Sequence, residues 1–355
     1  MLGDITETSI GSKVTLMGWV QTRRDHGGLI FIDLRDVGGL VQLVFNPEID
    51  ARAHKAAHAI RSEFVLAVKG EVCARPAETE NPELKSGMVE VMVETLKILA
   101  ESAPLPFMIE DETDVAEELR LKYRYLDLRR TSLKNNFILR HNVARSARDY
   151  LSDNGFLEIE TPVLTKSTPE GARDYLVPSR LAPGNFYALP QSPQIFKQIL
   201  MIAGFDRYFQ VTKCFRDEDL RAERQPEFTQ IDAEMSFVDC DDVIETFEGL
   251  ISAIFKDAMG RELDLPFPRL TYADSLERYG VDNPDTRFGM ELRNISGAVF
   301  GSGFKVFDSA IEKGGVVKAL KVDKGADFSR KDLDDLTELA ATYGAKGLAW
   351  VKVNE

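Results

Sequence analysis

Alternating apolar and polar residues dominate the first hundred positions of the chain. Runs of this period predict strands, and an alanine-rich helix is expected after the third of them. The five expected strands cover residues 13–23, 28–36, 39–45, 63–74 and 88–98, and the helix covers about 50–62. Five strands with a helix after the third is the order of an OB-fold, a small β-barrel that often binds single-stranded nucleic acid. We therefore predict an OB-fold domain over residues 1–105.

The same alternation separates inner from outer side chains of this barrel. In the strand around residue 32, the two isoleucines and the leucine share the inner face, which puts Phe31 outside. The rule also sends Gln42 and Glu90 outward, so that both are expected to be exposed. An outward Phe near an outward Gln and Glu can stack on one base and read the edges of others. A Phe that merely caps the barrel is an equally good interpretation.

The pattern changes after residue 105, where two prolines break it, and residues 106–130 are predicted to be a linker. A helix is expected over 131–154, where apolar residues recur on one stripe and Gly155 can end the helix in a left-handed conformation. The stripe consists of Leu133, Phe137, Ala144, Ala147 and Leu151. The strand that follows ends at Pro162, which fits only a strand end or edge.

Two further strands are predicted at 208–215 and 228–237, joined by a loop of charged and amide residues. Arg216 opens the loop with a planar guanidinium suited to a phosphate or carboxylate, and Phe228 returns opposite it with a flat aromatic face. An arginine, a ring and acids around one strand pair suit a bound nucleotide. The other interpretation is a charged hairpin with a solvated tip.

A short helix is predicted just before this strand pair. Ser192 followed by Pro193 favours a helix start, with the Ser192 side chain as the N-cap. On this helix Gln194 and Lys197 share one face. Its apolar residues Ile195, Ile199 and Leu200 are expected to pack into the core.

Composition and charge narrow the class of protein. With 355 residues, 44% apolar and 29% charged, the chain has material for two or three globular domains. No apolar run approaches a membrane span and no signal peptide begins the chain, so a cytoplasmic protein that does not enter a membrane is expected. Three distant cysteines predict reduced thiols. His54 and His58 have metal-ligand spacing, but no third ligand lies near, so a surface helix is favoured.

The net charge of −14 argues against nonspecific wrapping of nucleic acid, but one segment is strongly basic. Nine lysines and arginines between residues 120 and 148 face a single acid, Asp127. Contact with RNA phosphates and packing between two domains are equally good interpretations of this segment.

Several motifs together resemble a known family. Residues 215–218 and 224–228 are similar to the second signature motif of class II aminoacyl-tRNA synthetases, and residues 155–164 to the first. With 168–175 and 191–194 between them, the chain resembles the bacterial-type aspartyl-tRNA synthetases over essentially all its length. The resemblance implies a multidomain α+β protein. It would contain an OB-fold anticodon-binding domain, a hinge, an antiparallel-sheet catalytic domain over 131–285, and part of an α/β insertion domain over 286–355.

The resemblance also implies roles for residues at matching positions. The catalytic residue would be Arg216. The aspartate-binding residues would be Glu170, Gln194, Lys197, Arg216 and Asp232. The ATP-binding residues would be Arg216, Asp217, Glu218, Gln225 and Phe228. The residues facing the anticodon would be Arg24, His26, Phe31, Gln42 and Glu90.

The implied reaction has two steps. Aspartate attacks the α-phosphorus of ATP to give aspartyl-adenylate, and the 3′ end of aspartate tRNA then takes the acyl group. As a bare residue His26 suits a solvated loop, but at its place it resembles family members that also charge asparagine tRNA, whose product goes to a tRNA-dependent amidotransferase. The first motif implies a homodimer. Mg²⁺ is expected with ATP, but its ligands are expected beyond residue 355, so no metal site is predicted within the chain.

The last seventy residues depart from the family pattern. The third motif, a glycine-rich strand and a helix ending in a catalytic Arg, is not found before Glu355. The chain is therefore expected to be part of a longer enzyme, and to be weak or inactive alone. Strands are predicted at 305–308, 316–322 and 348–353, and a helix at 329–343.

Three alternatives to this function are kept. An asparagine- or lysine-type synthetase would share the order of the motifs but alter residues 168–175 and 194–197. A catalytically inactive tRNA-binding fragment would keep the barrel surface. A stand-alone RNA-binding regulator would need neither Arg216, Phe228 nor Lys197, whose presence argues against it.

Overall fold

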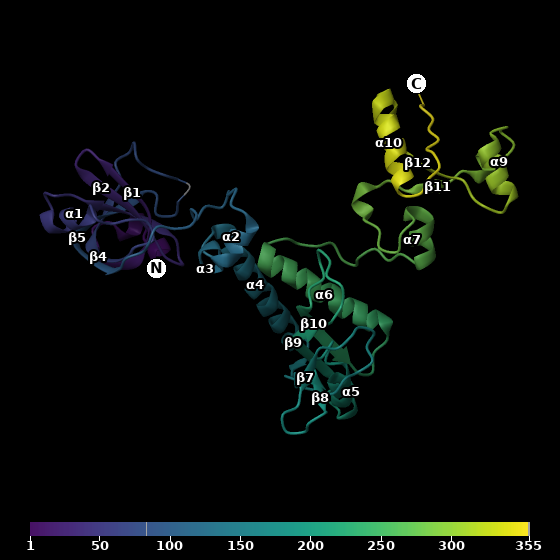
Figure 1. Ribbon diagram of the computed structural model, residues 1–355, viewed down its shortest axis with the longest axis horizontal. Helices are drawn as coiled ribbons and strands as arrows, with labels where there is room; N and C mark the ends of the chain where they lie inside the picture. Colours follow the sequence, from purple (N-terminus) through teal and green to yellow (C-terminus); the bar gives the residue numbers. More distant parts are fainter. Residues whose placement is uncertain (83, 354–355) are drawn as a thin grey trace. The chain divides into compact units, whose positions relative to one another are not determined.

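The computed structural model describes residues 1–82 and 84–353 (Figure 1). The chain forms two compact units, Met1–Ile138 and Leu139–Glu355. This division lies between residues 138 and 139 and does not test the predicted domain limits at residues 105, 130 and 285, which stay predictions.

The first unit is built on a closed five-stranded barrel. Its elements are β1 (Lys13–His26), β2 (Leu29–Arg35), β3 (Leu40–Phe45), α1 (Ala51–Ala57), β4 (Val65–Ala74) and β5 (Val89–Ala100). The strands follow the order β1-β2-β3-β5-β4, and only the β3–β5 pair is parallel. Strand order, closure and the helix after β3 confirm the predicted OB-fold.

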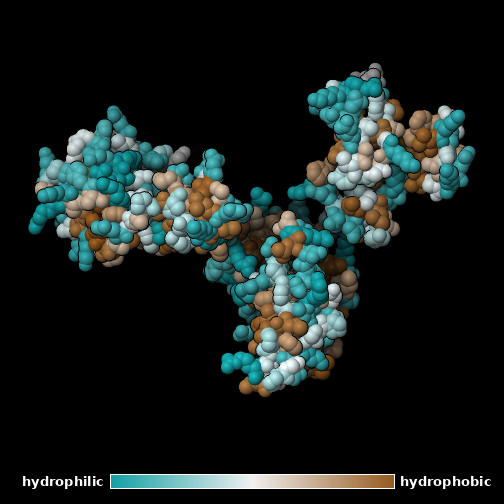
Figure 2. Space-filling view, in the orientation of Figure 1, coloured by the Kyte–Doolittle hydropathy of each residue, from teal (hydrophilic) through white to brown (hydrophobic). Residues whose placement is uncertain are grey.

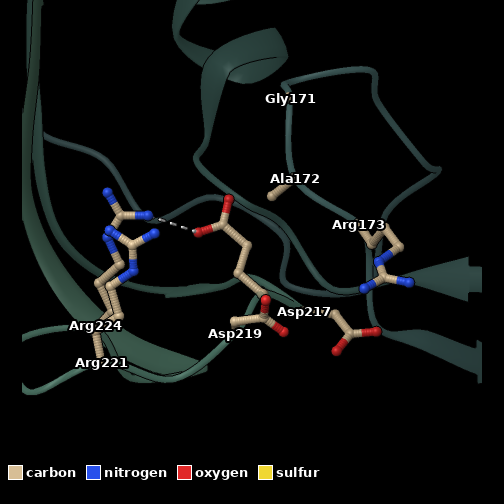
Figure 3. A pocket seen from close by; sticks show the side chains of 8 residues that line it. Gly171, Ala172, Arg173, Asp217, Asp219, Arg221 and Arg224 are labelled. Atoms are coloured by element: carbon tan, nitrogen blue, oxygen red, sulfur yellow. Dashed lines mark ion pairs between the residues drawn. The ribbon is translucent and has the colours of Figure 1, made fainter.

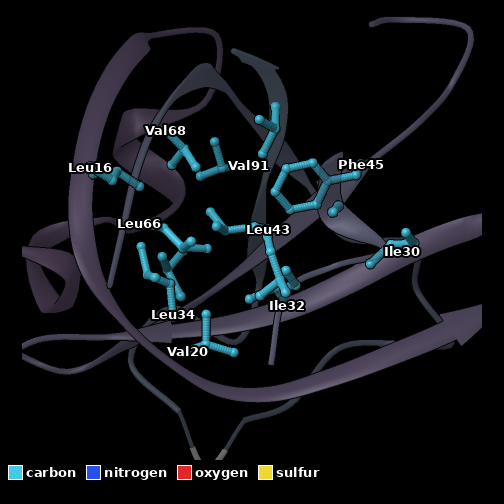
Figure 4. Close-up of a cluster of buried hydrophobic side chains, with 14 of the residues drawn as sticks. Leu16, Val20, Ile30, Ile32, Leu34, Leu43, Phe45, Leu66, Val68 and Val91 are labelled. Carbon is cyan, nitrogen blue, oxygen red and sulfur yellow. The ribbon is translucent and has the colours of Figure 1, made fainter. Parts of the chain in front are cut away.

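The barrel core contains the side chains that the alternation assigned to the inner face. Ile30, Ile32 and Leu34 are fully buried, together with Leu43 of β3 and Leu66 of β4 (Figure 4). Two short 3₁₀ helices, η1 (Leu2–Asp4) and η2 (Glu7–Ser9), precede the barrel. Because apolar side chains of all five strands meet inside, the outer face remains available for polar residues.

The segment between barrel and long helix is a small folded module. Helices α2 (Glu117–Lys122) and α3 (Arg124–Asp127) close over the buried side chains of Phe107, Ile109 and Leu126. The carboxylate of Asp127 is fully buried and lies 2.7 Å from Arg124, 3.1 Å from Arg130 and 3.8 Å from Arg120. Arg129 pairs with the buried carboxylate of Glu63. Four cations of the basic segment are therefore engaged within the protein, as expected for packing.

Helix α4 (Thr131–Asp153) begins where the module ends. Ala147 and Leu151 are buried, and Gly155 follows with a φ of 81°, as predicted. Phe137, however, is exposed, so the predicted apolar stripe is wrong for the first part of the helix. The hydrophobic cluster of the second unit includes Ala147, Tyr150 and Leu151 from the second half of α4 and, among the described residues, none from its first half.

The second unit contains a three-stranded sheet. It has the order β10 (Glu227–Met235), β9 (Arg207–Phe215), β6 (Leu157–Glu158), with β9 and β10 antiparallel as predicted. Helix α6 (Cys240–Met259) contributes Leu250 to the core between the sheet and α4. The hairpin β7 (Leu176–Pro178) and β8 (Phe186–Ala188) and the helix α5 (Gln194–Ile202) precede β9.

The last part of the chain contains short elements. They are α7 (Tyr272–Tyr279), η3 (Thr286–Phe288), β11 (Leu292–Asn294), α8 (Ser296–Val299), α9 (Lys305–Glu312), β12 (Lys318–Leu320), η4 (Gly325–Asp327) and α10 (Arg330–Thr342). Strand β12 lies within the predicted strand 316–322, and α10 confirms the predicted helix. Exposed apolar side chains gather on the α9 segment, among them Phe300, Phe304 and Val306 (Figure 2).

Two strand predictions in this part are wrong. Residues 305–308 begin α9, because the apolar residues continue at helical spacing through Ile311. Residues 348–353 form no strand, since no neighbouring strand pairs with them within the described chain, and an unpaired strand is not stable. No helix within residues 1–82 and 84–353 is both long and apolar enough to cross a membrane.

Candidate active site

The candidate site lies on one face of the β9–β10 pair, because the two faces differ in chemistry. Phe209 of β9 and Ile231, Ala233 and Met235 of β10 point to the hydrophobic core. Alternate residues therefore point the other way. On this polar face lie Tyr208, Gln210, Thr212 and Cys214, opposite Glu234, Asp232, Gln230 and Phe228 respectively. The antiparallel register places three polar cross-strand pairs side by side, with Cys214 and Phe228 as a fourth pair at their end.

A buried ion cluster occupies the middle of this face. The Lys197 ammonium, on α5, lies 2.8 Å from Asp232 Oδ1 and 3.3 Å from Glu234 Oε2. Only 12% of the Lys197 side chain and 9% of the Asp232 side chain are exposed. Burial alone would lower the pKa of Lys197, but the two carboxylates raise it above its ordinary value. Lys197 is therefore charged.

Arg216 and Phe228 meet at the open end of the strand pair. The Arg216 guanidinium carbon lies 5.1 Å from the centre of the Phe228 ring, a cation–π contact. Arg216 Nε and Asp232 Oδ2 are both buried without a hydrogen-bond partner among the described residues. A buried donor and a buried acceptor left unpaired are costly to a folded protein, so both suit groups that a ligand completes.

Cys214 is buried on the same polar face, and the charges of this face affect the pKa of its thiol. Burial, with the negative charge of Asp232, raises the pKa of the fully buried Cys214 thiol to about 11. The charges of Arg216, Glu170 and Lys197 act on the same thiol. Glu170 lies in the loop before β7, Lys197 on α5, Asp232 on β10 and Arg216 directly after β9, and the charges of all four act on the Cys214 thiol.

Glu170 is held by two hydroxyl groups. Its Oε2 accepts a hydrogen bond from Ser192 Oγ at 2.6 Å and its Oε1 one from Thr168 Oγ1 at 2.9 Å. The Ser192 hydroxyl donates its hydrogen bond to Glu170, and α5 begins after Pro193 without a side-chain cap. The predicted role of Ser192 as N-cap is therefore wrong. Ile195 and Ile199 are exposed, which corrects their predicted burial in the core, since α5 turns its polar side to the strands.

The loop between the strands forms a polar pocket of about 290 Å³ (Figure 3). Gly171, Ala172 and Arg173 line one side, and Asp217, Glu218, Asp219, Arg221 and Arg224 line the other. Arg224 lies 3.7 Å from Glu218, an ion pair visible in Figure 3. Of the remaining residues predicted to bind substrates, Gln194 is half-buried at the start of α5 and Gln225 is exposed in the loop.

The predicted RNA-binding residues lie together on the outer face of the barrel. Gln42 Nε2 donates to Glu90 Oε2 at 2.8 Å, and Arg24 donates to Gln42 Oε1 at 3.0 Å. Gln42 and Glu90 are only 6% and 4% exposed, so their predicted exposure is wrong. Outward side chains on adjacent strands satisfy and cover each other here. Phe31 is half-buried and His26 is exposed.

Sequence reasoning missed a hydrogen-bonded chain at the edge of the site. Gln210 Oε1 accepts from Thr161 Oγ1 at 2.9 Å and from Tyr208 Oη at 3.1 Å, and all three residues are buried. The available signal was the run of polar residues at alternate positions of β9. Within the described residues, no three or more His, Cys, Asp or Glu side chains gather as a metal ion requires.

Comparison with known families decides what this arrangement belongs to. The model described as tRNA synthetases class II (D, K and N) matches residues 116–341, and the model of the OB-fold nucleic acid binding domain matches residues 14–99. This chain is a class II tRNA synthetase of the D, K and N group. The resemblance stated from the sequence motifs is confirmed.

Curated relatives of this synthetase chain carry a more specific name. The chain is 60% identical over 353 residues to the aspartate–tRNA(Asp/Asn) ligase of Syntrophotalea carbinolica. The matched region covers 99% of this chain and 59% of that protein. It is 61% identical over 351 residues to the ligase of the same name from Geotalea uraniireducens, with 99% and 59% covered. The chain thus spans about three fifths of the length of the curated relatives it matches.

Solved structures agree with the synthetase fold. The chain is similar to asparaginyl-tRNA synthetase from Pyrococcus horikoshii complexed with asparaginyl-adenylate, with a TM-score of 0.64 and 25% identity over 72% of this chain and 57% of that one. The fold is also shared with aspartyl-tRNA synthetase from Entamoeba histolytica, with a TM-score of 0.64, 23% identity, and 78% and 62% covered.

Proposed function

We propose that this chain takes part in charging tRNA with aspartate, and that the polar face of β9–β10 binds aspartate and ATP for the formation of aspartyl-adenylate. The observation that carries the proposal is the geometry of this face, where Arg216 lies over Phe228, Lys197 pairs with Asp232, and Arg216 Nε and Asp232 Oδ2 are buried without a hydrogen-bond partner among the described residues. These are the residue types that a nucleotide and a small dicarboxylic amino acid require.

Aspartate is held by charges of both signs in this proposal. The Lys197 ammonium has three donors, and its two carboxylate partners leave one for the side-chain carboxylate of the substrate. Asp232 and Glu170 offer carboxylate oxygens to the α-ammonium group, and Gln194 borders the same space. Asparagine is disfavoured because its neutral amide is a weaker partner for the third donor of Lys197 than a carboxylate is.

ATP lies toward the loop 216–226 in this proposal, with Asp217, Glu218 and Gln225 along its path. Arg216 bridges the α-phosphate and the attacking carboxylate, and it stabilises charge that develops in the transition state. In the structure the Arg216 guanidinium lies over the Phe228 ring, so adenine stacks on this ring only after the guanidinium has moved toward the phosphate. Mg²⁺ would supply charge neutralisation of the phosphates, but the described residues form no site for it, and no step here depends on it.

The barrel reads the anticodon in this proposal, with Phe31 stacking a base and Arg24 facing base edges, while the buried Gln42 and Glu90 hold Arg24 in place through the Arg24–Gln42 and Gln42–Glu90 hydrogen bonds. Charging of both aspartate and asparagine tRNA is proposed because the relatives are named Asp/Asn ligases and His26 stands exposed beside this surface. A homodimer, a cytoplasmic location and hand-over of the asparagine tRNA product to an amidotransferase belong to the same proposal.

Calorimetric binding of non-hydrolysable adenylate analogues tests the proposal. We expect the aspartyl-adenylate analogue to bind this chain at least tenfold more tightly than the asparaginyl one, because only the former offers a carboxylate to the third donor of Lys197. Tighter binding of the asparaginyl analogue would favour the asparagine-type alternative. Binding of neither analogue, with tRNA still bound, would favour a tRNA-binding fragment.

The tRNA choice needs a separate measurement. Transcripts of aspartate tRNA and asparagine tRNA are offered in parallel, first to the chain in binding assays and then in charging assays. We expect comparable affinity for both, and replacement of His26 by Leu to weaken only the asparagine transcript. Failure to bind the asparagine transcript would contradict the dual specificity.

A further inference from the structure

Gln191 is a fully buried side chain that the proposed reaction does not use. It is 1% exposed and lies immediately before Ser192 and Pro193 at the start of α5. Its Oε1 accepts from the Ala172 amide at 3.1 Å, and its Nε2 donates to the Ala172 carbonyl at 2.9 Å and to Asp174 Oδ1 at 2.5 Å. One side-chain amide thus satisfies both backbone groups of Ala172, as a neighbouring strand would.

The segment held in this way borders the candidate site on two sides. Ala172 and Gly171 line the polar pocket of the loop, and the Asp217 amide donates to the Arg173 carbonyl at 2.9 Å (Figure 3). Two residues before Ala172, Glu170 is held by Ser192. Consecutive residues, Gln191 and Ser192, therefore fix the backbone and the carboxylate of one loop.

Apart from Gln191, residues 167–174 are held by exposed or half-buried groups, such as Ser192 at Glu170 and Asp217 at Arg173. No side chain of this segment is buried, so it contributes nothing to a hydrophobic core. Gly171 has a φ of 103°, which is strained for any other residue type. A polar segment without apolar anchors opens at low free-energy cost, so its position depends on its hydrogen bonds. The Gln191 amide supplies the only buried partner of this segment that is described here.

We propose that Gln191 is a positioning residue that holds residues 170–174 closed and thereby sets the place of Glu170 for the amino group of the bound amino acid. It acts through Ala172 and does not touch the substrate. The inference rests on the proposed function for the role of Glu170. The clamp itself is a property of the protein without substrate, so the two are tested separately.

The test compares three variants with the unmodified chain. Gln191→Glu keeps the shape of the side chain, but the carboxylate cannot donate to the Ala172 carbonyl and it repels Asp174. Adding Asp174→Asn removes this repulsion and restores one hydrogen bond between the two side chains. Gln198→Glu makes the same chemical change on an exposed residue of α5 and serves as the control.

Amide hydrogen exchange without ligand measures the clamp. In Gln191→Glu we expect the amides of residues 170–174 to exchange about tenfold faster or more, because the loss of buried hydrogen bonds lowers the cost of opening by that order. The double variant should recover part of the protection, and Gln198→Glu should keep all of it. Unchanged exchange in Gln191→Glu overturns the proposal, as does a uniform increase over the whole second unit.

Ligand binding measures the positioning. Affinity for the non-hydrolysable aspartyl-adenylate analogue should fall about tenfold in Gln191→Glu and recover in part in the double variant. Affinity for ATP alone should change less than twofold, since Glu170 serves the amino acid. Equal losses for both ligands overturn the positioning role. If the unmodified chain binds no analogue, the proposed function and the positioning role fail together, while the exchange data still decide the clamp.

Discussion

Single residues on the polar face of β9–β10 act as compensated charges. Lys197 is buried between Asp232 and Glu234, and Arg216 lies over Phe228 with one nitrogen unpaired. Such groups are expensive to bury, and a protein retains them where a ligand completes the pairing. Substitutions at these positions therefore affect stability and binding through different atoms.

Replacing Lys197 by Met should destabilise the protein, because the change removes the cation and leaves Asp232 buried without a partner. Removing one partner of a buried ion pair costs about 3–5 kcal/mol, which a urea titration would detect. Lys213→Met, which removes an exposed lysine near the end of β9, is the control and should cost less than about 1 kcal/mol. Equal losses for the two variants would contradict the buried pairing.

Replacing Arg216 by Ala should slow aspartate-dependent pyrophosphate exchange by roughly 10²–10³-fold, the loss typical of a charged stabiliser of the transition state. Arg216→Lys should recover part of the rate, because the charge remains while the planar fork is lost. Arg180→Ala, on the exposed hairpin loop, should leave the rate unchanged. A normal rate in Arg216→Ala would remove the arginine from the proposed mechanism.

The raised pKa of Cys214 predicts how its reactivity depends on pH. Its value of about 11 against an ordinary 9.0 means that, near pH 8, the reactive thiolate is roughly hundredfold scarcer than in an ordinary thiol. Alkylation followed by mass spectrometry should modify the exposed Cys240 first and Cys214 last. The rate at Cys214 should rise with pH up to about 11. Early modification of Cys214 in the folded protein would contradict its burial.

The same shift has a consequence for stability, and its sign is fixed. Between pH 9.0 and about 11 the unfolded chain releases the Cys214 proton while the folded protein keeps it. The contribution of this thiol to the free energy of unfolding is therefore complete below pH 9.0 and is lost progressively through that interval.

At the scale of helices and strands, the hydrophobic period of a segment predicts its structure only where the folded chain offers that segment a neighbour to pair or pack with. The strands of the barrel and the β9–β10 pair were predictable, because alternation and β-branched residues coincide with hydrogen-bonded neighbours. Residues 348–353 show a similar pattern but pair with no strand among the described residues, and residues 305–308 belong to a helix. Local sequence carries the preference of a segment, but the partner that realises it lies elsewhere in the chain.

The module of α2 and α3 offers a test at this scale. Replacing Asp127 by Asn would leave three arginines around a neutral amide, which should destabilise the module by about 3 kcal/mol. Limited proteolysis should then cut residues 102–130 faster than in the unmodified chain. Asp114→Asn, an exposed carboxylate of the same segment, is the matched control and should leave the cleavage rate unchanged.

For the whole molecule, the division into two units predicts separable folding. Residues 1–128 contain the complete barrel core and the α2–α3 module. Produced alone, this piece should unfold cooperatively on heating and show the dispersed amide spectrum of a folded β-protein. A spectrum typical of a disordered chain would show that the barrel needs the second unit.

Much of the molecule was predictable from its sequence, and the misses share one cause. Arg216 and Phe228 lie against each other, as the strand pattern indicated. The burial of Gln42 and Glu90 and the use of Ser192 by Glu170 were not predictable. Each depends on which polar side chain a folded neighbour presents, and periodicity carries no information about that choice.

The two-faced strand pair also restricts how the gene can change. Deleting or duplicating one codon inside β9 would turn every later side chain of the strand to the opposite face. Apolar side chains of the core face would then point into the pocket, and charged side chains would point into the hydrophobic core. Codons gained or lost between Asp219 and Glu223, in the exposed loop tip, carry no such penalty. Lineages descended from this gene should therefore differ in loop length while keeping the strand length constant.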